Sequence, residues 1–154
     1  MHDPSRYAVY FTPRHTEPLW RVGSSILGYD SASGESVPFP ADCLSAFPSW
    51  PEITEEPRKY GFHATLKAPF QLAAECDQAG LIAAVRRIAR AHSPIEGVDL
   101  KLKSIGKFAA LAPSRPMPEI GRLEALVVTG LEEFRAPLSA ADRARRLASP
   151  LSPR

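Results

Sequence analysis

The sixteen prolines of this 154-residue chain set the tightest limit on what it can fold into. Proline fixes the backbone φ angle and lacks an N–H donor, so it ends helices and is excluded from central strands. The prolines gather between segments of regular hydrophobic period. This distribution predicts short helices and strands joined by many loops, in a chain long enough for one domain with a real core and short for two.

The periodic segments alternate between strand-like and helix-like patterns. Strands are predicted over 6–13, 60–70 and 97–113, the last of them a half-buried hairpin that turns near Gly106. Helices are predicted over 18–28, 77–92 and 118–134. This order predicts an α+β fold, with a mainly antiparallel sheet and helices packed on one side.

The remaining segments carry weaker signals. Residues 28–57 are rich in turn-forming residues and predict a long loop with at most one short helix near 41–47. Residues 136–154 predict an exposed helix, opened by the capping-box pair Ser139 and Asp142, and then a tail. Thr16 is the expected N-cap of the first helix, and Gly28 is its expected C-terminal stop.

The charge balance and the cysteines exclude several classes of protein. Residues 1–70 hold 6 Lys and Arg against 8 Asp and Glu, whereas residues 71–154 hold 13 against 9. The basic second part is compatible with a phosphate-bearing ligand, although a solvated helix face and a charged tail account for it more readily. Cys43 and Cys76 are too few for a disulfide framework and lack zinc-site spacing. The sequence has no signal peptide and no membrane-length apolar run, so we expect a cytoplasmic protein.

The run YGFHATLKAPF, residues 60–70, holds the candidate site. On a strand, His63, Thr65 and Lys67 project from one face. The apolar residues between and beside them are expected to face the core: Phe62, Ala64, Leu66 and Ala68. Histidine exchanges protons near neutral pH, a threonine hydroxyl bonds phosphoryl oxygens, and lysine attracts anions. The three side chains therefore suit half of a phosphoryl-transfer site, but their spacing alone favours the solvent-facing side of an ordinary sheet.

Other chemical motifs are weak or absent. The remaining histidines, at positions 2, 15 and 92, have no metal-ligand spacing, and we expect neither a metal nor a cofactor. The segment GSSILG lacks the spacing of a nucleophile elbow, and no glycine-rich loop of the G-x-x-x-x-G-K type is present. No strand interleaves aromatic and basic residues as RNA-binding surfaces do.

Four segments carry a resemblance to a known family. The segments RYAVYFTP, LWRVGSSILGYDSASGE, RKYGFHATLKAPF and EEFRAPLSAADRARR resemble the bacterial family named domain of unknown function 1045. That family is associated with phosphonate metabolism and with the two-histidine (2H) phosphoesterase superfamily. The resemblance implies a bilobal fold in which each lobe supplies one H-x-[ST] motif on a strand.

The resemblance also implies a chemistry. Superfamily members open cyclic phosphate esters, including the cyclic ends of RNA, without a metal: one histidine acts as base, the other as acid, and the Ser or Thr hydroxyls hold the phosphate. His63 and Thr65 match the first motif, so they are the expected catalytic residues, with Thr65 also binding phosphate. Lys67 is assigned to phosphate binding by its place on the same strand face. Tyr10 and Arg6 are further candidates to line the cleft.

A second H-x-[ST] motif does not occur in the sequence, because His92 is followed by Ser-Pro. Family members are longer, so three explanations stand: a fragment, a missing part supplied separately, or loss of half the catalytic pair. The expected function is a metal-independent phosphoesterase for a small cyclic phosphate ester, with RNA ends as the one nucleic-acid substrate and no membrane partner. The alternative is a non-catalytic module that binds a phosphate ester or a nucleotide.

Overall fold

A computed structural model of the chain describes residues 5–106 and 108–148, without the side chains of Ala141, Arg145 and Arg146. The predicted tail after residue 148 and His2 lie outside the described residues. The strands are β1 (Arg6–Phe11), β2 (Tyr29–Asp30), β3 (Glu35–Ser36), β4 (Ala64–Gln71), β5 (Leu100–Ile105) and β6 (Phe108–Pro113). The helices are α1 (Pro18–Leu27), α2 (Ala41–Ala46), α3 (Trp50–Ile53), α4 (Glu55–Arg58), α5 (Gln78–Ala91), α6 (Pro118–Gly130), the 3₁₀ helix η1 (Glu132–Phe134) and α7 (Ala140–Ala148).

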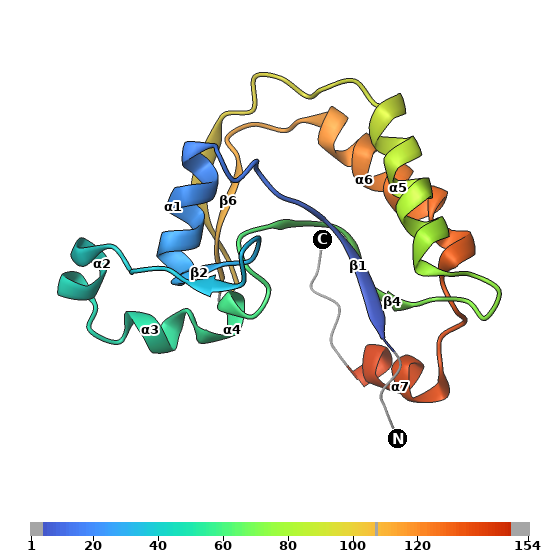
Figure 1. The fold of residues 1–154 in the computed structure, drawn as a ribbon, viewed down its shortest axis with the longest axis horizontal. Helices are drawn as coiled ribbons and strands as arrows, with labels where there is room; N and C mark the ends of the chain where they lie inside the picture. The colour runs from blue at the N-terminus through green and yellow to red at the C-terminus, as the bar shows by residue number, and fades with distance from the viewer. Residues whose placement is uncertain (1–4, 107, 149–154) are drawn as a thin grey trace. The chain divides into compact units, whose positions relative to one another are not determined.

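The fold is α+β, as the order of the periodic segments predicts (Figure 1). The sheet is smaller than expected: the described strands form three two-stranded ladders, β1 with β4, β2 with β3, and β5 with β6. The last two ladders are antiparallel. Hydrophobic period identifies strands but not their partners, so the sequence did not predict which strands pair.

The chain divides into two compact units. One unit is Val9–Leu66, and the other joins Met1–Ala8 to Lys67–Arg154. We call them the α1 unit and the α5–α6 unit. The division runs through β1 and β4, so each unit holds one end of both strands.

Helix α1 organises the α1 unit. Pro18 occupies its first turn, and Gly28 ends it in the left-handed conformation (φ 72°), as the sequence predicts. The expected cap at Thr16 was wrong: the N-cap is Glu17, and no side chain caps the helix. Trp20 is buried on the inner face of α1 and donates its indole N–H to Asp30 Oδ2 at 3.2 Å. This bond ties α1 to the β2–β3 hairpin.

The segment 28–57 is more regular than the predicted loop. The short helix expected near 41–47 is α2, but β2, β3, α3 and the start of α4 also form here. Arg58 holds this region to α1, because its Nε donates to Leu27 O at 2.8 Å and its Nη2 donates to Pro51 O at 2.7 Å. These bonds satisfy carbonyls near helix ends, where intrahelical donors run out. Strands of two residues and helices of four are too short to show a hydrophobic period, so the sequence does not predict them.

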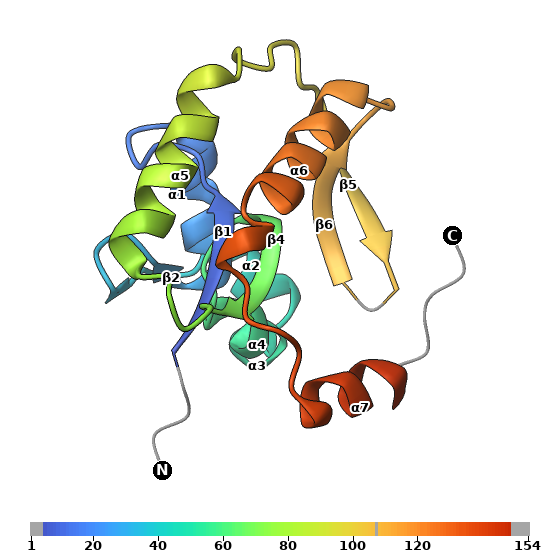
Figure 2. The same cartoon turned by 90° about the vertical axis from the view of Figure 1, so that its right-hand side faces the viewer.

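Helices α5 and α6 lie side by side in the α5–α6 unit (Figures 1 and 2). Asp77 caps α5 by accepting the N–H of Gly80 at 2.7 Å. The core of this unit consists of Phe70, Leu81, Ala84, Val127 and Leu131. Beyond β4, backbone bonds join Ala136 to Gln71 and Ala73 to Phe134, so the segment after η1 runs along the end of that strand.

Strands β5 and β6 form the predicted hairpin, drawn at the side of α6 in Figure 2. Gly106 follows β5 with φ 61°, a conformation that suits glycine. The prediction of a half-buried strand was wrong, because every residue of β5 is exposed, Leu102 by 73%. Near the C-terminus, Ser139 and Asp142 make the predicted capping contact at the start of α7: Asp142 N–H donates to Ser139 Oγ at 3.0 Å.

Candidate functional site

His63 lies one residue before β4, at the end of the turn that leads into this strand. The predicted alternation of a polar face and a core face does not hold along the strand. Thr65 is exposed as expected, but Lys67 is buried, whereas Ala64 and Ala68 are exposed. Thr65 and Lys67 therefore lie in different surroundings, although they are two residues apart.

Two close contacts fix the backbone immediately before His63. Gly61 is buried with φ +72°, and a Cβ at this position would lie 2.5 Å from the Cβ and Oγ atoms of Ser31. Phe62 covers the space left by Gly23 of α1, where a Cβ would lie 2.3 Å from Phe62 Cγ. Only glycine fits at positions 23 and 61 without displacing a neighbour. The tripeptide Gly-Phe-His is thus held between α1 and the β2–β3 turn.

The imidazole of His63 has a defined hydrogen bond. Its Nδ1 lies 2.9 Å from Gly61 O. A carbonyl oxygen only accepts, so Nδ1 must carry the proton, and in the neutral ring Nε2 carries the lone pair. Nε2 makes no hydrogen bond to the part of the chain that the structure describes. The ring therefore presents one nitrogen, in one tautomer, for proton exchange with a ligand.

Two tyrosine rings flank this imidazole. The Tyr10 ring, from β1, lies over it with centroids 3.9 Å apart and planes inclined by 32°. The Tyr60 ring is farther, at 6.3 Å and 50°, and is 57% exposed. Tyr10 was predicted as a cleft-lining residue; the structure places it in direct contact with His63.

Thr65 presents its hydroxyl from an exposed position on β4. Within the described residues this hydroxyl makes no hydrogen bond. It is therefore free to donate to, or accept from, a ligand oxygen.

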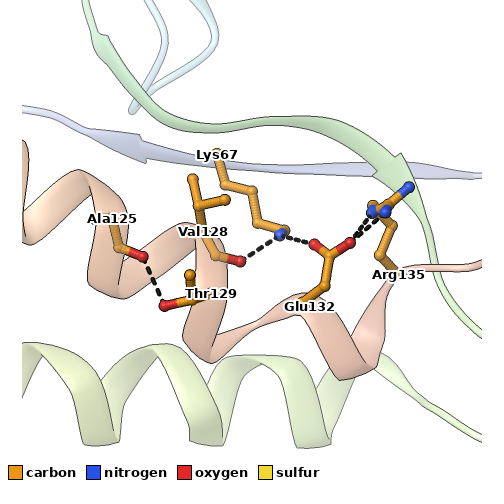
Figure 3. Close-up of polar contacts among 6 residues, drawn as sticks. All are labelled: Lys67, Ala125, Val128, Thr129, Glu132 and Arg135. Atoms are coloured by element: carbon orange, nitrogen blue, oxygen red, sulfur yellow. Dashed lines mark hydrogen bonds and ion pairs between the residues drawn. The ribbon is translucent and has the colours of Figure 1, made fainter.

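Lys67 is occupied by contacts within the α5–α6 unit (Figure 3). Its side chain is 5% exposed, and its ammonium donates to Val128 O at 2.8 Å and to Glu132 Oε2 at 3.0 Å. Glu132 Oε1 accepts from the Arg135 guanidinium on its other side. Hydrogen bonds from Arg135 and Lys67 lower the pKa of the Glu132 carboxyl from 4.5 to about 2.

Arg6, the other predicted cleft residue, also belongs to the α5–α6 unit. Its Nη2 donates to Pro69 O at 3.3 Å, and its side chain is exposed. The residues that the structure brings together around His63 are thus Tyr10, Tyr60 and Gly61, all of the α1 unit.

Sequence reasoning missed Gly61 and Tyr60 as parts of this site. The sequence Y-G-F-H does place a glycine two residues before the candidate histidine, and glycine takes backbone conformations that other residues rarely adopt. Nothing in the sequence singles out the contact between Gly61 and Ser31, because it joins positions thirty residues apart.

A concave region lies between the end of α5 and the start of α6. It encloses about 550 Å³, and its charged lining includes Arg115, Arg122, Glu96 and Glu119. Its lining thus carries charges of both signs. Across the described residues, no three His, Cys, Asp or Glu side chains gather as a metal site would require. Within the same residues, every helix is too short or too polar to cross a bilayer.

Comparison with known proteins assigns the family. A family described as "Protein of unknown function (DUF1045)" matches residues 65–154. The chain belongs to this family. The DUF1045 match begins at Thr65, so it includes Thr65 and Lys67, stops just short of His63, and leaves Tyr10 far outside it.

Two curated proteins extend the similarity over nearly the whole chain. Both are named ribose 1,5-bisphosphate phosphokinase PhnN. The protein from Janthinobacterium sp. (strain Marseille) is 36% identical over 156 residues, which are 97% of this chain and 33% of that protein. The protein from Laribacter hongkongensis (strain HLHK9) is 32% identical over 132 residues, 86% of this chain and 31% of that protein. The DUF1045 chain thus spans about a third of each relative. No solved structure matches it.

Proposed function

We propose that this chain carries one half of a two-histidine phosphoesterase site, with His63 as its acid–base group and Thr65 as its phosphate ligand. The observation that carries the proposal is the bond from His63 Nδ1 to Gly61 O, which leaves Nε2 as the exchanging nitrogen two residues before an exposed hydroxyl. His63 and Thr65 also match the H-x-[ST] motif that the resemblance to 2H phosphoesterases implies.

The proposed reaction opens a cyclic phosphate ester without a metal. Water attacks phosphorus, one ring P–O bond breaks, and the product is a phosphate monoester with a free hydroxyl. His63 takes a proton from the water or gives one to the leaving oxygen, and Thr65 donates its hydroxyl hydrogen to a phosphoryl oxygen. Each acid–base group contributes roughly 10²–10⁴-fold. With a single H-x-[ST] motif, the 154-residue chain alone is expected to turn over slowly.

The spacing of Lys67 on the strand suggests that it binds phosphate, but the proposal gives it a structural role. Its ammonium is buried against Val128 O and Glu132, so we assign it to holding β4 on α6 and η1 rather than to phosphate. Tyr10 is placed beside His63, and Arg6 is left outside the site.

The names of the curated relatives bear on the substrate. They describe enzymes that act on a ribose bisphosphate, and the family resemblance is associated with phosphonate metabolism. We propose that the ester handled by this chain is a sugar or nucleoside cyclic phosphate from that metabolism. A kinase activity of the chain itself is not proposed, because its sequence has no glycine-rich loop of the phosphate-cradling type.

The second candidate function is a non-catalytic module that binds a phosphate ester. The single H-x-[ST] motif favours this alternative, because one histidine cannot act as base and acid on opposite sides of the phosphorus at the same time. Binding without turnover would support the module, whereas turnover that depends on His63 would support the enzyme.

Titration with inorganic phosphate, followed by NMR, tests the binding step that both functions share. Phosphate is expected to move the signals of His63 and Thr65 over the millimolar range. Thr65→Val should weaken this binding roughly 10- to 100-fold, since it removes one hydrogen bond to a charged group, worth roughly 1.5–3 kcal/mol. Thr16→Val, at another exposed threonine of the α1 unit, is the matched control and should bind as the natural chain does. Unmoved His63 and Thr65 signals would overturn the assignment.

A further inference from the structure

Tyr10 contacts His63 closely, although the proposed reaction gives Tyr10 no chemical role. Tyr10 bonds nothing with its hydroxyl in the described part of the chain, and no step of the proposed reaction uses that hydroxyl. Its ring nevertheless lies 3.9 Å, centroid to centroid, from the imidazole. Contact between two aromatic rings stabilises their relative position beyond the effect of the area that it buries.

The hydrogen bond to Gly61 O does not by itself fix the imidazole. A hydrogen bond tolerates a range of angles, so the ring can still rock about its Cβ–Cγ bond while Nδ1 stays near Gly61 O, and Nε2 then points in a range of directions. A second contact, on the flat face of the ring, removes this freedom. Tyr10 supplies that contact at 3.9 Å, whereas Tyr60 lies at 6.3 Å and is mostly exposed.

The support for Tyr10 comes from its strand. It lies on β1, which pairs with β4, and its neighbour Val9 is buried. A strand holds its side chains more firmly than a loop does, so β1 presents the ring to His63 from a fixed position. Gly61, at the other edge of the imidazole, is held by its close approach to Ser31. The imidazole is thereby held by a carbonyl at one edge and by an aromatic ring on one face.

We infer that Tyr10 is a positioning residue for His63: its ring, not its hydroxyl, holds the imidazole in the orientation that keeps the proton on Nδ1 and leaves Nε2 for the substrate. This inference rests on the proposed function only for its effect on turnover. Its effect on the tautomer of His63 follows from the geometry alone.

The test compares Tyr10→Ile with Tyr10→Phe. Isoleucine keeps a strand-forming apolar side chain but removes the ring, and phenylalanine keeps the ring but removes the hydroxyl. Long-range ¹H–¹⁵N correlations of the His63 ring report the tautomer, and 2′,3′-cyclic AMP is the substrate for kinetics. Tyr10→Phe should keep the Nδ1–H tautomer and a turnover within about twofold of the natural chain. Tyr10→Ile should mix the tautomers and lower kcat roughly tenfold or more with little change in KM, since small misplacements of a reacting group cost this much.

Two outcomes would overturn the inference. One is a Tyr10→Ile chain with an unchanged tautomer and kcat. The other is a Tyr10→Phe chain as impaired as Tyr10→Ile, which would assign the role to the hydroxyl.

A measurement on the natural chain covers the case in which Tyr10→Ile folds poorly. Stacking at 3.9 Å predicts strong ring-current shifts of the His63 ring protons, and their absence would also overturn the inference. Failure of the proposed function gives a different result, because full activity in His63→Ala would leave the tautomer comparison intact.

Discussion

At the scale of single residues, His63 shows how a common residue type acquires a defined chemical state. An H-x-T motif fixes neither the tautomer nor the direction of the imidazole. The bond to Gly61 O fixes the first, and the Tyr10 ring, in our inference, fixes the second. Gly61 supports the first, because its backbone carries the accepting carbonyl.

Gly61→Ala is expected to lower the free energy of unfolding by more than the cost of placing alanine in a left-handed backbone conformation. A left-handed residue other than glycine costs about 1–2 kcal/mol. At Gly61 the new Cβ would also lie 2.5 Å from the Ser31 side chain. Urea denaturation should therefore show a loss in the free energy of unfolding above about 2 kcal/mol.

Gly34→Ala is the matched control for this substitution. Gly34 has φ +78° but nothing within 4 Å of the position that a Cβ would take, so it isolates the conformational cost. Equal losses for Gly34→Ala and Gly61→Ala would contradict the close approach of Gly61 to Ser31.

The burial of Lys67 is a property of a single residue that the sequence could not predict. Its place in the alternation with His63 and Thr65 predicted a solvent-facing cation. The structure buries it because Val128 and Glu132, more than sixty positions away, supply an acceptor and a counter-charge. Spacing within a strand carries no information about such distant partners.

At the scale of elements, the Lys67–Glu132 pair joins β4 to the end of α6 and to η1 (Figure 3). The ammonium end of this pair is buried, and removing one partner of a buried pair costs more than the pair contributes. The contact therefore matters chiefly as a constraint on where β4 meets the two helices.

The pair predicts how stability depends on pH. The Glu132 carboxyl has its pKa lowered from 4.5 to about 2 in the folded chain, by hydrogen bonds from Arg135 and Lys67. A carboxyl with a lowered folded-state pKa stabilises the fold above its unfolded pKa. This stabilisation should decline as pH falls below about 4.5 and vanish as pH passes through about 2.

Chemical denaturation between pH 7 and pH 2 checks this prediction. The natural chain should be more stable than Glu132→Gln at neutral pH, and the difference should shrink to nothing toward pH 2. Glu133→Gln, at the neighbouring exposed position, is the control and should follow the natural chain. A difference between the natural chain and Glu132→Gln that persists at pH 2 would contradict the assigned cause.

Elements long enough to repeat their hydrophobic pattern several times were predictable, and very short elements were not. Helix α5 begins and ends within a residue of its prediction, because its apolar stripe spans several turns and Asp77 caps it. The β5–β6 hairpin was predicted from alternation and Gly106, but its burial was not. Alternation predicts which residues share a face, whereas burial depends on what packs against that face.

At the scale of the whole molecule, the α+β class follows from the order of the periodic segments, but the division into two units does not. Both β1 and β4 contribute to both units, so no loop or shift in composition marks the boundary. The candidate site belongs to the α1 unit, and the DUF1045 match lies almost entirely in the α5–α6 unit. Family membership is therefore established mainly by residues that do not contact His63.

The central claim is that His63 exchanges a proton with a phosphate ester. The initial rate of 2′,3′-cyclic AMP hydrolysis, measured for the natural chain, His63→Ala and His92→Ala, tests it most directly. The natural chain should turn over slowly, His63→Ala should lose roughly 10²-fold or more of that rate, and His92→Ala should keep it. Undiminished hydrolysis by His63→Ala, or a natural chain no faster than buffer, would contradict the claim.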